Sequence, residues 1–326
     1  MQPIVERYGS LNPYFQYYYQ LHKNVDERMM EVLEALLASR YADNTYVIFT
    51  SDHGDLLGSH NGMHQKWYTA YDEALRVPLI VWHKNLDSVP RIVDNLTSHV
   101  DIAPTLLGLA GLDPEPLRAK LAIDHSDARP LVGRNLSPLV LDTANPVAFE
   151  QPLYFMTDDD PSRGPNQDNW TGITVNSVIQ PNHLETVIAR LAGPDGTKVW
   201  KFTRYFDNPQ FWSSPGDPPP TSSPGSSSTV VEDVVIDQLE PTPTEDGTQP
   251  LACNVSVKHR PVDDEFEMYN VTDDPMELEN LYSKTSPLPE QPVLEALLAE
   301  QCALKRLTPC SGDVPGQPDC GQGSCS

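Results

Sequence analysis

The stretch TSDHGDLLGSHNGMHQK, residues 50–66, gathers side chains that bind metal ions and anions. A carboxylate and an imidazole at adjacent positions, here Asp52 and His53, can both reach one divalent cation. Gly54 permits the tight turn that such a pair needs, and the Lys66 ammonium offers a compact positive charge to an oxyanion. The stretch therefore predicts a site for a cation and an anionic group, against the alternative of a solvated loop that is merely rich in histidine.

Alternating helices and strands must position this stretch. Residues 45–50, TYVIFT, form a β-branched and aromatic run with the length of a buried strand. The candidate ligands follow its carboxyl end, where open α/β sheets bind their ligands. The other predicted elements of this part are a helix at 24–40, a short helix at 67–75, a strand at 77–82 and a helix at 98–112. This order is typical of an open α/β sheet.

The first and the last of these predicted helices have recognisable ends. In the first, Asn24 and Glu27 have the spacing of a capping box. In the last, Asp101 can cap the first turn, Pro104 suits that turn, and Gly111 lies near the end. Both helices are therefore predicted to begin at these capping residues.

Beyond about residue 145 the predicted elements are shorter. They are strands at 152–157, 183–191 and 198–206, a strand that leads into an acidic turn at 265–282, and a helix at 292–306. Residues 208–229 are rich in proline and serine, which predicts an exposed and poorly ordered loop. The chain is thus predicted to divide into a first domain at 1–145, a C-terminal subdomain at 146–300 and a Cys-rich tail at 301–326.

Composition narrows the partners and leaves the compartment open. The 326 residues include 22 basic and 46 acidic side chains, a net charge of −24, which argues against nucleic acid as the main partner. No run of about eighteen apolar residues occurs, so no transmembrane segment is predicted, and the first residues lack the apolar core of a signal peptide. Five cysteines, four of them in the tail, and five glycosylation sequons would suit an oxidising, extracytoplasmic compartment without establishing it.

The string TSDHGDLLGSH, together with Lys66 and YDEALRVPLIV, resembles the sulfatase family of the alkaline-phosphatase superfamily. The resemblance continues in YYYQLHKNVDERMMEVLEAL, SHVDIAPTLLGLAGL, GRNLSPLV, WKFTRYF and EFEMYNVTDDPMELENL. It implies an α/β chain that forms part of an alkaline-phosphatase-like α/β/α sandwich with a smaller C-terminal α+β subdomain. Residues 1–145 would then be the C-terminal part of the catalytic domain.

The resemblance also implies roles for single residues. Asp52 and His53 match the family's second pair of metal ligands, and the metal would be calcium (Ca2+) or alternatively Mn2+ or Zn2+. Lys66 matches the lysine that contacts sulfate or phosphate oxygens, and His60 occupies a Gly-x-His position that is structural or substrate-facing. These two are the candidate catalytic residues, whereas His64 has no firm counterpart. The implied substrate is a small-molecule or glycan sulfate ester.

The family's nucleophile is not found in this sequence. Sulfatases carry it in a Cys/Ser-x-Pro-x-Arg motif, and none of the five cysteines here is followed by proline and arginine at those spacings. The first pair of acidic ligands is missing as well. We therefore expect a truncated chain that does not hydrolyse sulfate esters by itself. Two alternatives stay open: a phosphonate monoester or phosphodiester hydrolase on the same scaffold, and a non-catalytic binding module derived from a sulfatase.

Overall fold

The computed structural model describes residues 11–63, 65–66, 69–86, 90–125, 128–157, 167–168, 174–175, 181, 183–206, 234–238, 253–257 and 263–305. The chain divides into two compact units, one formed by Gln2–Lys66 and Tyr71–Leu153, the other by Trp67–Ala70 and Tyr154–Ser326. We call them the N-terminal and the C-terminal unit. His64, the predicted insert at 208–229 and the tail beyond residue 305 lie outside the described residues. The predicted domain limits stay predictions.

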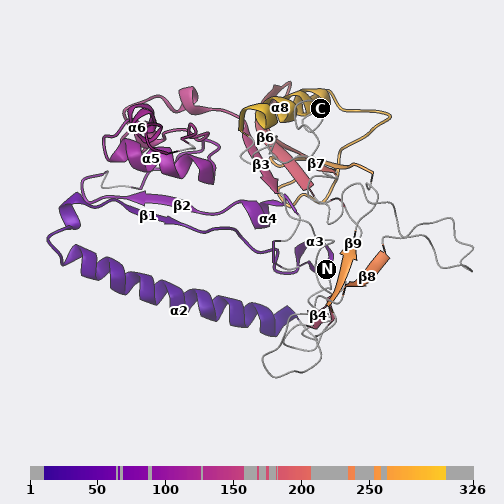
Figure 1. Cartoon of the computed structure of the whole chain (residues 1–326), viewed down its shortest axis with the longest axis horizontal. Helices are drawn as coiled ribbons and strands as arrows, with labels where there is room; N and C mark the ends of the chain where they lie inside the picture. The colour runs from indigo at the N-terminus through magenta and orange to yellow at the C-terminus, as the bar shows by residue number, and fades with distance from the viewer. Residues whose placement is uncertain are drawn as a thin grey trace, which may run out of the picture. The chain divides into compact units, whose positions relative to one another are not determined.

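The described part of the N-terminal unit begins with one long helix, α2 (Leu11–Leu37), drawn in indigo in Figure 1. The prediction of a helix start at Asn24 was wrong. Asn24 lies inside α2, and its side chain accepts a hydrogen bond from Gln20 Nε2 at 2.8 Å instead of capping the helix. Aromatic rings one turn apart extend the helix toward its N-terminus, with centroids 6.4 Å apart for Tyr14 and Tyr18 and 4.4 Å apart for Tyr18 and His22.

The two predicted strands of this unit are present and pair with each other. They are β1 (Val47–Thr50), which follows the short 3-10 helix η1 (Ala42–Asn44), and β2 (Leu79–Trp82). They run antiparallel and lie side by side (Figure 1). The described residues between them include two short helical segments, α3 (Ser59–Gly62) and α4 (Asp72–Leu75). Of the predicted helix at 67–75, residues 72–75 are helical and residues 69–71 are not, while residues 67 and 68 lie outside the described part.

The rest of the N-terminal unit consists of short helices: η2 (His99–Asp101), α5 (Ile102–Leu109), α6 (Pro114–Leu121), α7 (Ser137–Val140) and η3 (Pro146–Phe149). Ser98, rather than Asp101, is the capping residue of the predicted helix at 98–112. Ser98 and Asp101 form a capping box in which the Asp101 carboxylate accepts the Ser98 backbone N–H at 3.0 Å. Pro104 lies in the first turn of α5, and Gly111 has a positive φ of 71° just after its end, as predicted.

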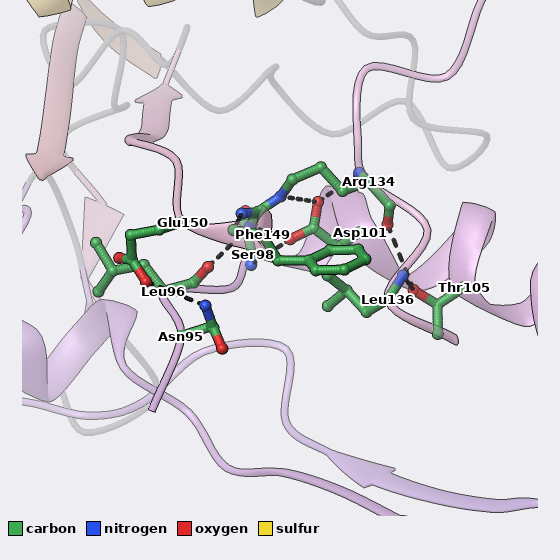
Figure 2. Close-up of polar contacts among 9 residues, drawn as sticks. All are labelled: Asn95, Leu96, Ser98, Asp101, Thr105, Arg134, Leu136, Phe149 and Glu150. Carbon is green, nitrogen blue, oxygen red and sulfur yellow. Dashed lines mark hydrogen bonds and ion pairs between the residues drawn. The ribbon is translucent and has the colours of Figure 1, made fainter. Parts of the chain in front are cut away.

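A buried ion pair between Asp101 and Arg134 lies among these short helices (Figure 2). Arg134 Nη2 lies 2.7 Å from Asp101 Oδ2, and the two side chains are only 13% and 3% exposed. The same guanidinium donates to the carbonyl oxygens of Phe149 and Leu96 at 2.7 and 2.8 Å. Gly133 is needed beside it, because a Cβ there would lie 1.8 Å from the Val100 carbonyl oxygen. One side chain thus ties three segments of the unit.

The C-terminal unit is built on a four-stranded sheet of order β10-β7-β6-β3. Its strands are β3 (Leu153–Thr157), β6 (His183–Gly193), β7 (Gly196–Phe206) and β10 (Glu265–Asn270). Helix α8 (Glu290–Lys305) packs on it. Two small antiparallel pairs, β4 (Gln167–Asp168) with β5 (Thr174–Val175) and β8 (Val234–Gln238) with β9 (Cys253–Val257), complete the described strands. The predicted strands and the final helix are therefore confirmed, with small shifts of their ends.

Apolar side chains from the sheet and α8 form the core of the C-terminal unit. Val187, Phe202, Met268 and Leu294 are at most 1% exposed and belong to one cluster. Cys302, which is disulfide-bonded, lies in the same cluster. Among the described residues, no helix of either unit is long and apolar enough to cross a bilayer.

Candidate functional site

Three of the predicted site residues converge just beyond the carboxyl end of β1. Asp52 Oδ2 lies 3.3 Å from His53 Nε2, and the Lys66 ammonium contacts the same nitrogen of His53. Asp52 is largely exposed, His53 is about one-third exposed and Lys66 is exposed, so all three are open to solvent. The arrangement places a carboxylate, an imidazole and an ammonium within reach of one small ligand.

A closed loop brings Lys66 back to His53, thirteen positions earlier in the chain. The Asp55 carboxylate accepts the backbone N–H groups of Leu57 at 2.8 Å and Gln65 at 3.2 Å. The Leu56 N–H donates to the Gln65 carbonyl at 2.9 Å, and the Leu56 side chain, 1% exposed, anchors the loop in the unit. Because residues 55–56 are bonded to residue 65, residue 66 must lie opposite residues 53–54.

Hydrogen bonds to the backbone determine which atoms Asp52 and His53 can offer to a cation. His53 Nδ1 lies 2.7 Å from the Gly54 carbonyl oxygen, an acceptor only, so Nδ1 carries the hydrogen and Nε2 presents its lone pair. A hydrogen bond from the His53 backbone N–H lowers the pKa of the Asp52 carboxyl below its ordinary value. The Asp52 carboxyl therefore favours its charged form, which is the form that binds a cation.

Helix α4 supports the turn that carries the two ligands. The Gly54 N–H donates to the Ala74 carbonyl at 2.8 Å. A Cβ at Gly54 would lie 1.9 Å from the Glu73 carbonyl oxygen, so only glycine allows this close approach of two backbones. The position of Asp52 and His53 therefore depends on α4 as well as on β1.

His60 is held against α4 instead of joining the other three residues. Its ring stacks on Tyr71 with centroids 3.6 Å apart and planes 7° apart, and its Nε2 lies 3.4 Å from Glu73 Oε2. The side chain is only 9% exposed, and its φ of 48° lies in the left-handed region. These contacts favour the structural of the two roles expected for His60. His64 lies outside the described residues.

The donor atoms fit two positions of a divalent cation site. Two ligands at right angles around Ca2+, each about 2.3–2.6 Å from it, lie about 3.3–3.7 Å apart, and the 3.3 Å between Asp52 Oδ2 and His53 Nε2 agrees with this spacing. Within the part of the chain that the structure describes, no group of three or more His, Cys, Asp or Glu side chains could hold a metal ion. The site described here thus supplies two ligands.

Sequence reasoning missed the residues that shape the loop. Asp55 closes it, and Tyr71 with Glu73 holds His60. Aspartate side chains in turns often accept the backbone N–H two positions on, as Asp55 does from Leu57, so Asp55 itself was a usable signal. No comparable local signal joins His60 to Glu73, because the two lie thirteen positions apart in sequence.

Comparisons with known proteins find similarity to sulfatases. Residues 5–112 match the sulfatase family. The chain is similar to the uncharacterised sulfatase YidJ of Escherichia coli K12, with 37% identity over 101 residues, 31% of this chain and 20% of YidJ. It is also similar to the endo-4-O-sulfatase of Bacteroides thetaiotaomicron, with 35% identity over 128 residues (39% and 22% of the two chains), and to the choline-sulfatase of Rhizobium meliloti, with 33% identity over 96 residues (29% and 18%). The chain spans about a fifth of the length of these relatives.

A solved structure shares the fold. It is that of BT4656 in complex with its substrate D-glucosamine-2-N,6-O-disulfate, with a TM-score of 0.52 over 86% of this chain and 38% of that chain. Because the identity is 20%, the likeness concerns the fold alone. The predicted mixed α/β fold class is confirmed.

Proposed function

We propose that residues 50–66 form the cation-binding and sulfate-binding part of a sulfuric-ester hydrolase site. The observation that carries this proposal is the convergence of Asp52, His53 and Lys66 beyond the end of β1. The sulfatase-family match of residues 5–112 supports it. The substrate would be a small-molecule or glycan sulfate ester.

Each of the three side chains would have its own task. Asp52 and His53 would hold a divalent cation, with Ca2+ as the first expectation and Mn2+ or Zn2+ as alternatives. When bound, the cation would stabilise negative charge on the sulfate oxygens during hydrolysis. Lys66 would bind a sulfate oxygen, and its contact with His53 Nε2 means that it must move aside when the cation binds.

The cation proposal is tested by calorimetric titration of the full chain with Ca2+, Mn2+ and Zn2+. We expect weak binding, because two protein ligands rarely hold calcium against water. Asp52→Ala should lower the affinity at least about tenfold, the size of effect that loss of even an outer partner of a metal ligand produces. Asp43→Ala, which removes another exposed carboxylate of the same unit, is the control. Equal binding by wild type and Asp52→Ala would contradict the proposal.

Lys66 should affect the two ligands in opposite directions. Lys66→Met removes a positive charge beside the cation position. A divalent cation and a unit charge about 4 Å apart repel by about 2 kcal/mol in water, so cation affinity should rise roughly thirtyfold. The same substitution should abolish binding of inorganic sulfate. A fall in both affinities would show that Lys66 only maintains the loop.

We also expect no turnover of an aryl sulfate by these 326 residues alone. No cysteine or serine in them is followed by proline two positions later and arginine four positions later. This observation favours, as a second candidate, a non-catalytic module that binds a cation and an anion. Turnover that Asp52→Ala abolishes would refute the expectation, and tighter binding of phosphate than of sulfate would favour the phosphonate or phosphodiester alternative.

A further inference from the structure

The C-terminal unit contains a fully buried ion pair between Lys201 and Glu277. Lys201 Nζ lies 2.8 Å from Glu277 Oε1, and the two side chains are 1% and 0% exposed. Removing two charges from water is unfavourable, and apolar residues of similar volume often serve a protein interior as well or better. The pair therefore calls for a reason other than the stability of the sheet.

The backbone of Glu277 is also held in an unfavourable conformation. Its φ is 51°, in the left-handed region that residues other than glycine rarely adopt. Glu277 follows β10 in the acidic turn, and its N–H donates to the Asp274 carbonyl at 3.1 Å. The turn thus directs one carboxylate inward to Lys201, while neighbouring acidic residues stay at the surface.

Lys201 reaches beyond the sheet to a segment far away in sequence. Its Nζ donates to the Ala70 carbonyl at 2.8 Å, across 131 positions. Ala70 and Thr69 are 2% and 3% exposed. Residues 67–70 belong to the C-terminal unit, although the chain on both sides of them belongs to the N-terminal unit. The ammonium is therefore the buried partner of this short segment.

The segment lies between two parts of the proposed site. Lys66 precedes Ala70 by four positions, and α4 begins two positions after Ala70. Helix α4 in turn accepts the Gly54 N–H, next to the candidate ligand His53. Fixing Ala70 thus restricts both the chain that ends in Lys66 and the helix that supports Gly54.

We propose that Lys201 and Glu277 form a positioning pair that fixes residues 69–70, and through them Lys66 and α4, so that the proposed site depends on a buried charge in the C-terminal unit. Glu277 orients the Lys201 ammonium, and Lys201 holds the Ala70 carbonyl. The positioning concerns backbone geometry, whereas its consequence for sulfate rests on the function proposed above.

Hydrogen exchange of the full chain tests the positioning. Lys201→Met leaves the Glu277 carboxylate buried without the Lys201 charge and should accelerate exchange throughout the C-terminal unit. The double variant Lys201→Met/Glu277→Met removes both charges, and amides of β6 and β7 should regain most of their protection. In the double variant the amides of Gly54, Leu75 and Arg76 should still exchange roughly tenfold to hundredfold faster than in wild type, because a hydrogen bond to a charged group is lost.

The decisive quantity is the ratio of the exchange acceleration at Gly54, Leu75 and Arg76 to that at the β6 and β7 amides. A purely stabilising pair predicts that both sets recover together in the double variant, and that result overturns the proposal. Equal acceleration of both sets in the double variant also overturns it. Lys198→Met is the matched control, since Lys198 lies on the same strand and contacts Asp273 of the same turn, but at the surface. It should leave both sets unchanged.

A second measurement separates this inference from the proposed function. Inorganic sulfate is titrated calorimetrically into wild type, Lys66→Ala, Lys198→Met and the double variant. We expect affinity to be lost in Lys66→Ala, several-fold weaker in the double variant and unchanged in Lys198→Met. If wild type binds no sulfate, or Lys66→Ala binds it equally well, the proposed function fails, while the exchange ratio still decides the positioning. Wild-type sulfate affinity in the double variant would overturn the link to Lys66.

Discussion

In the C-terminal unit a sheet buries its large apolar side chains against one helix, whereas in the N-terminal unit the longest helix exposes them. Phe202, Met268 and Leu294 are at most 1% exposed. On α2, Val25 and Val32 are 55% and 71% exposed. Further exposed apolar residues of the N-terminal unit are Tyr17, Tyr19, Leu21, Met29, Met30, Leu37, Phe49, Leu79 and Ile80. Burial of apolar area is therefore unequal between the two units.

The N-terminal unit compensates with directed polar contacts. Arg134 joins three segments through Asp101 and two carbonyl groups, and Asp55 closes the loop that carries the candidate site. Such contacts depend on geometry more than on area. Hydrogen bonds therefore shape the candidate site of the N-terminal unit, while the C-terminal unit has the larger apolar core.

The largest effect should come from the apolar core. Phe202→Ala should lower the free energy of unfolding of the C-terminal unit by about 3–5 kcal/mol, because it removes a buried aromatic ring and leaves a cavity. Denaturant unfolding followed by hydrogen exchange at β6 and β7 measures the change.

Val32→Ala on α2 is the control for this comparison. Its side chain is 71% exposed, so the free energy of unfolding should change by no more than about 0.5 kcal/mol. A cost at Val32 similar to that at Phe202 would break the comparison, because it would show that α2 buries this face in solution.

The next largest effect concerns the buried ion pair between Arg134 and Asp101 in the N-terminal unit. Arg134→Met should destabilise that unit by roughly 3 kcal/mol, because the Asp101 carboxylate, 3% exposed, would stay buried without its partner. Arg118→Met, which breaks an exposed pair with Glu115, should cost less than about 0.5 kcal/mol. Residue-resolved hydrogen exchange distinguishes the units. If the β6 and β7 amides lost as much protection as those of the N-terminal unit, the effect of the Arg134–Asp101 pair would not be confined to its own unit.

Strands were predictable from the sequence where a local run of apolar residues marks them. Strands β1, β2, β6 and β7 each coincide with a predicted β-branched or aromatic run. The start of α2 was not predictable from the sequence. The Asn24–Glu27 spacing resembles a capping box, but the helix continues past Asn24 toward the N-terminus, where Tyr18 contacts His22. One of the five sequons, Asn270-Val271-Thr272, likewise shows that a local pattern does not reveal its surroundings. The Asn270 side chain is buried and donates to Asp273 Oδ2 at 2.9 Å, which a three-residue pattern does not reveal.

The candidate site was predictable in its residues but not in its support. Adjacent types and family resemblance pointed to Asp52, His53 and Lys66, and the structure brings these three together. The contacts of Lys201 with Ala70 and Glu277 span 131 and 76 positions. Such pairings arise from the folding of the whole unit, and no periodicity or spacing in a single sequence encodes them.

The smallest effect should come from the surface counterpart of the buried pair. A hydrogen bond to Asp273 raises the pKa of Lys198 above its ordinary value of 10.5. A raised lysine pKa means that the contribution to stability is fully present below about pH 10.5 and is lost as the pH rises through the pKa of the folded state. Because the pair is exposed to solvent, that contribution should be small and should weaken with salt.

Asp273→Asn tests this assignment without touching the core. NMR titration of the Lys198 side chain should show its pKa falling toward the ordinary value in the variant, because the main cause of the shift is removed. The β6 and β7 amides should keep their protection, in contrast to their behaviour in Lys201→Met. If Asp273→Asn instead exposes these amides as strongly as Lys201→Met does, the acidic turn as a whole stabilises the sheet, and the distinction between its buried and surface ion pairs no longer holds.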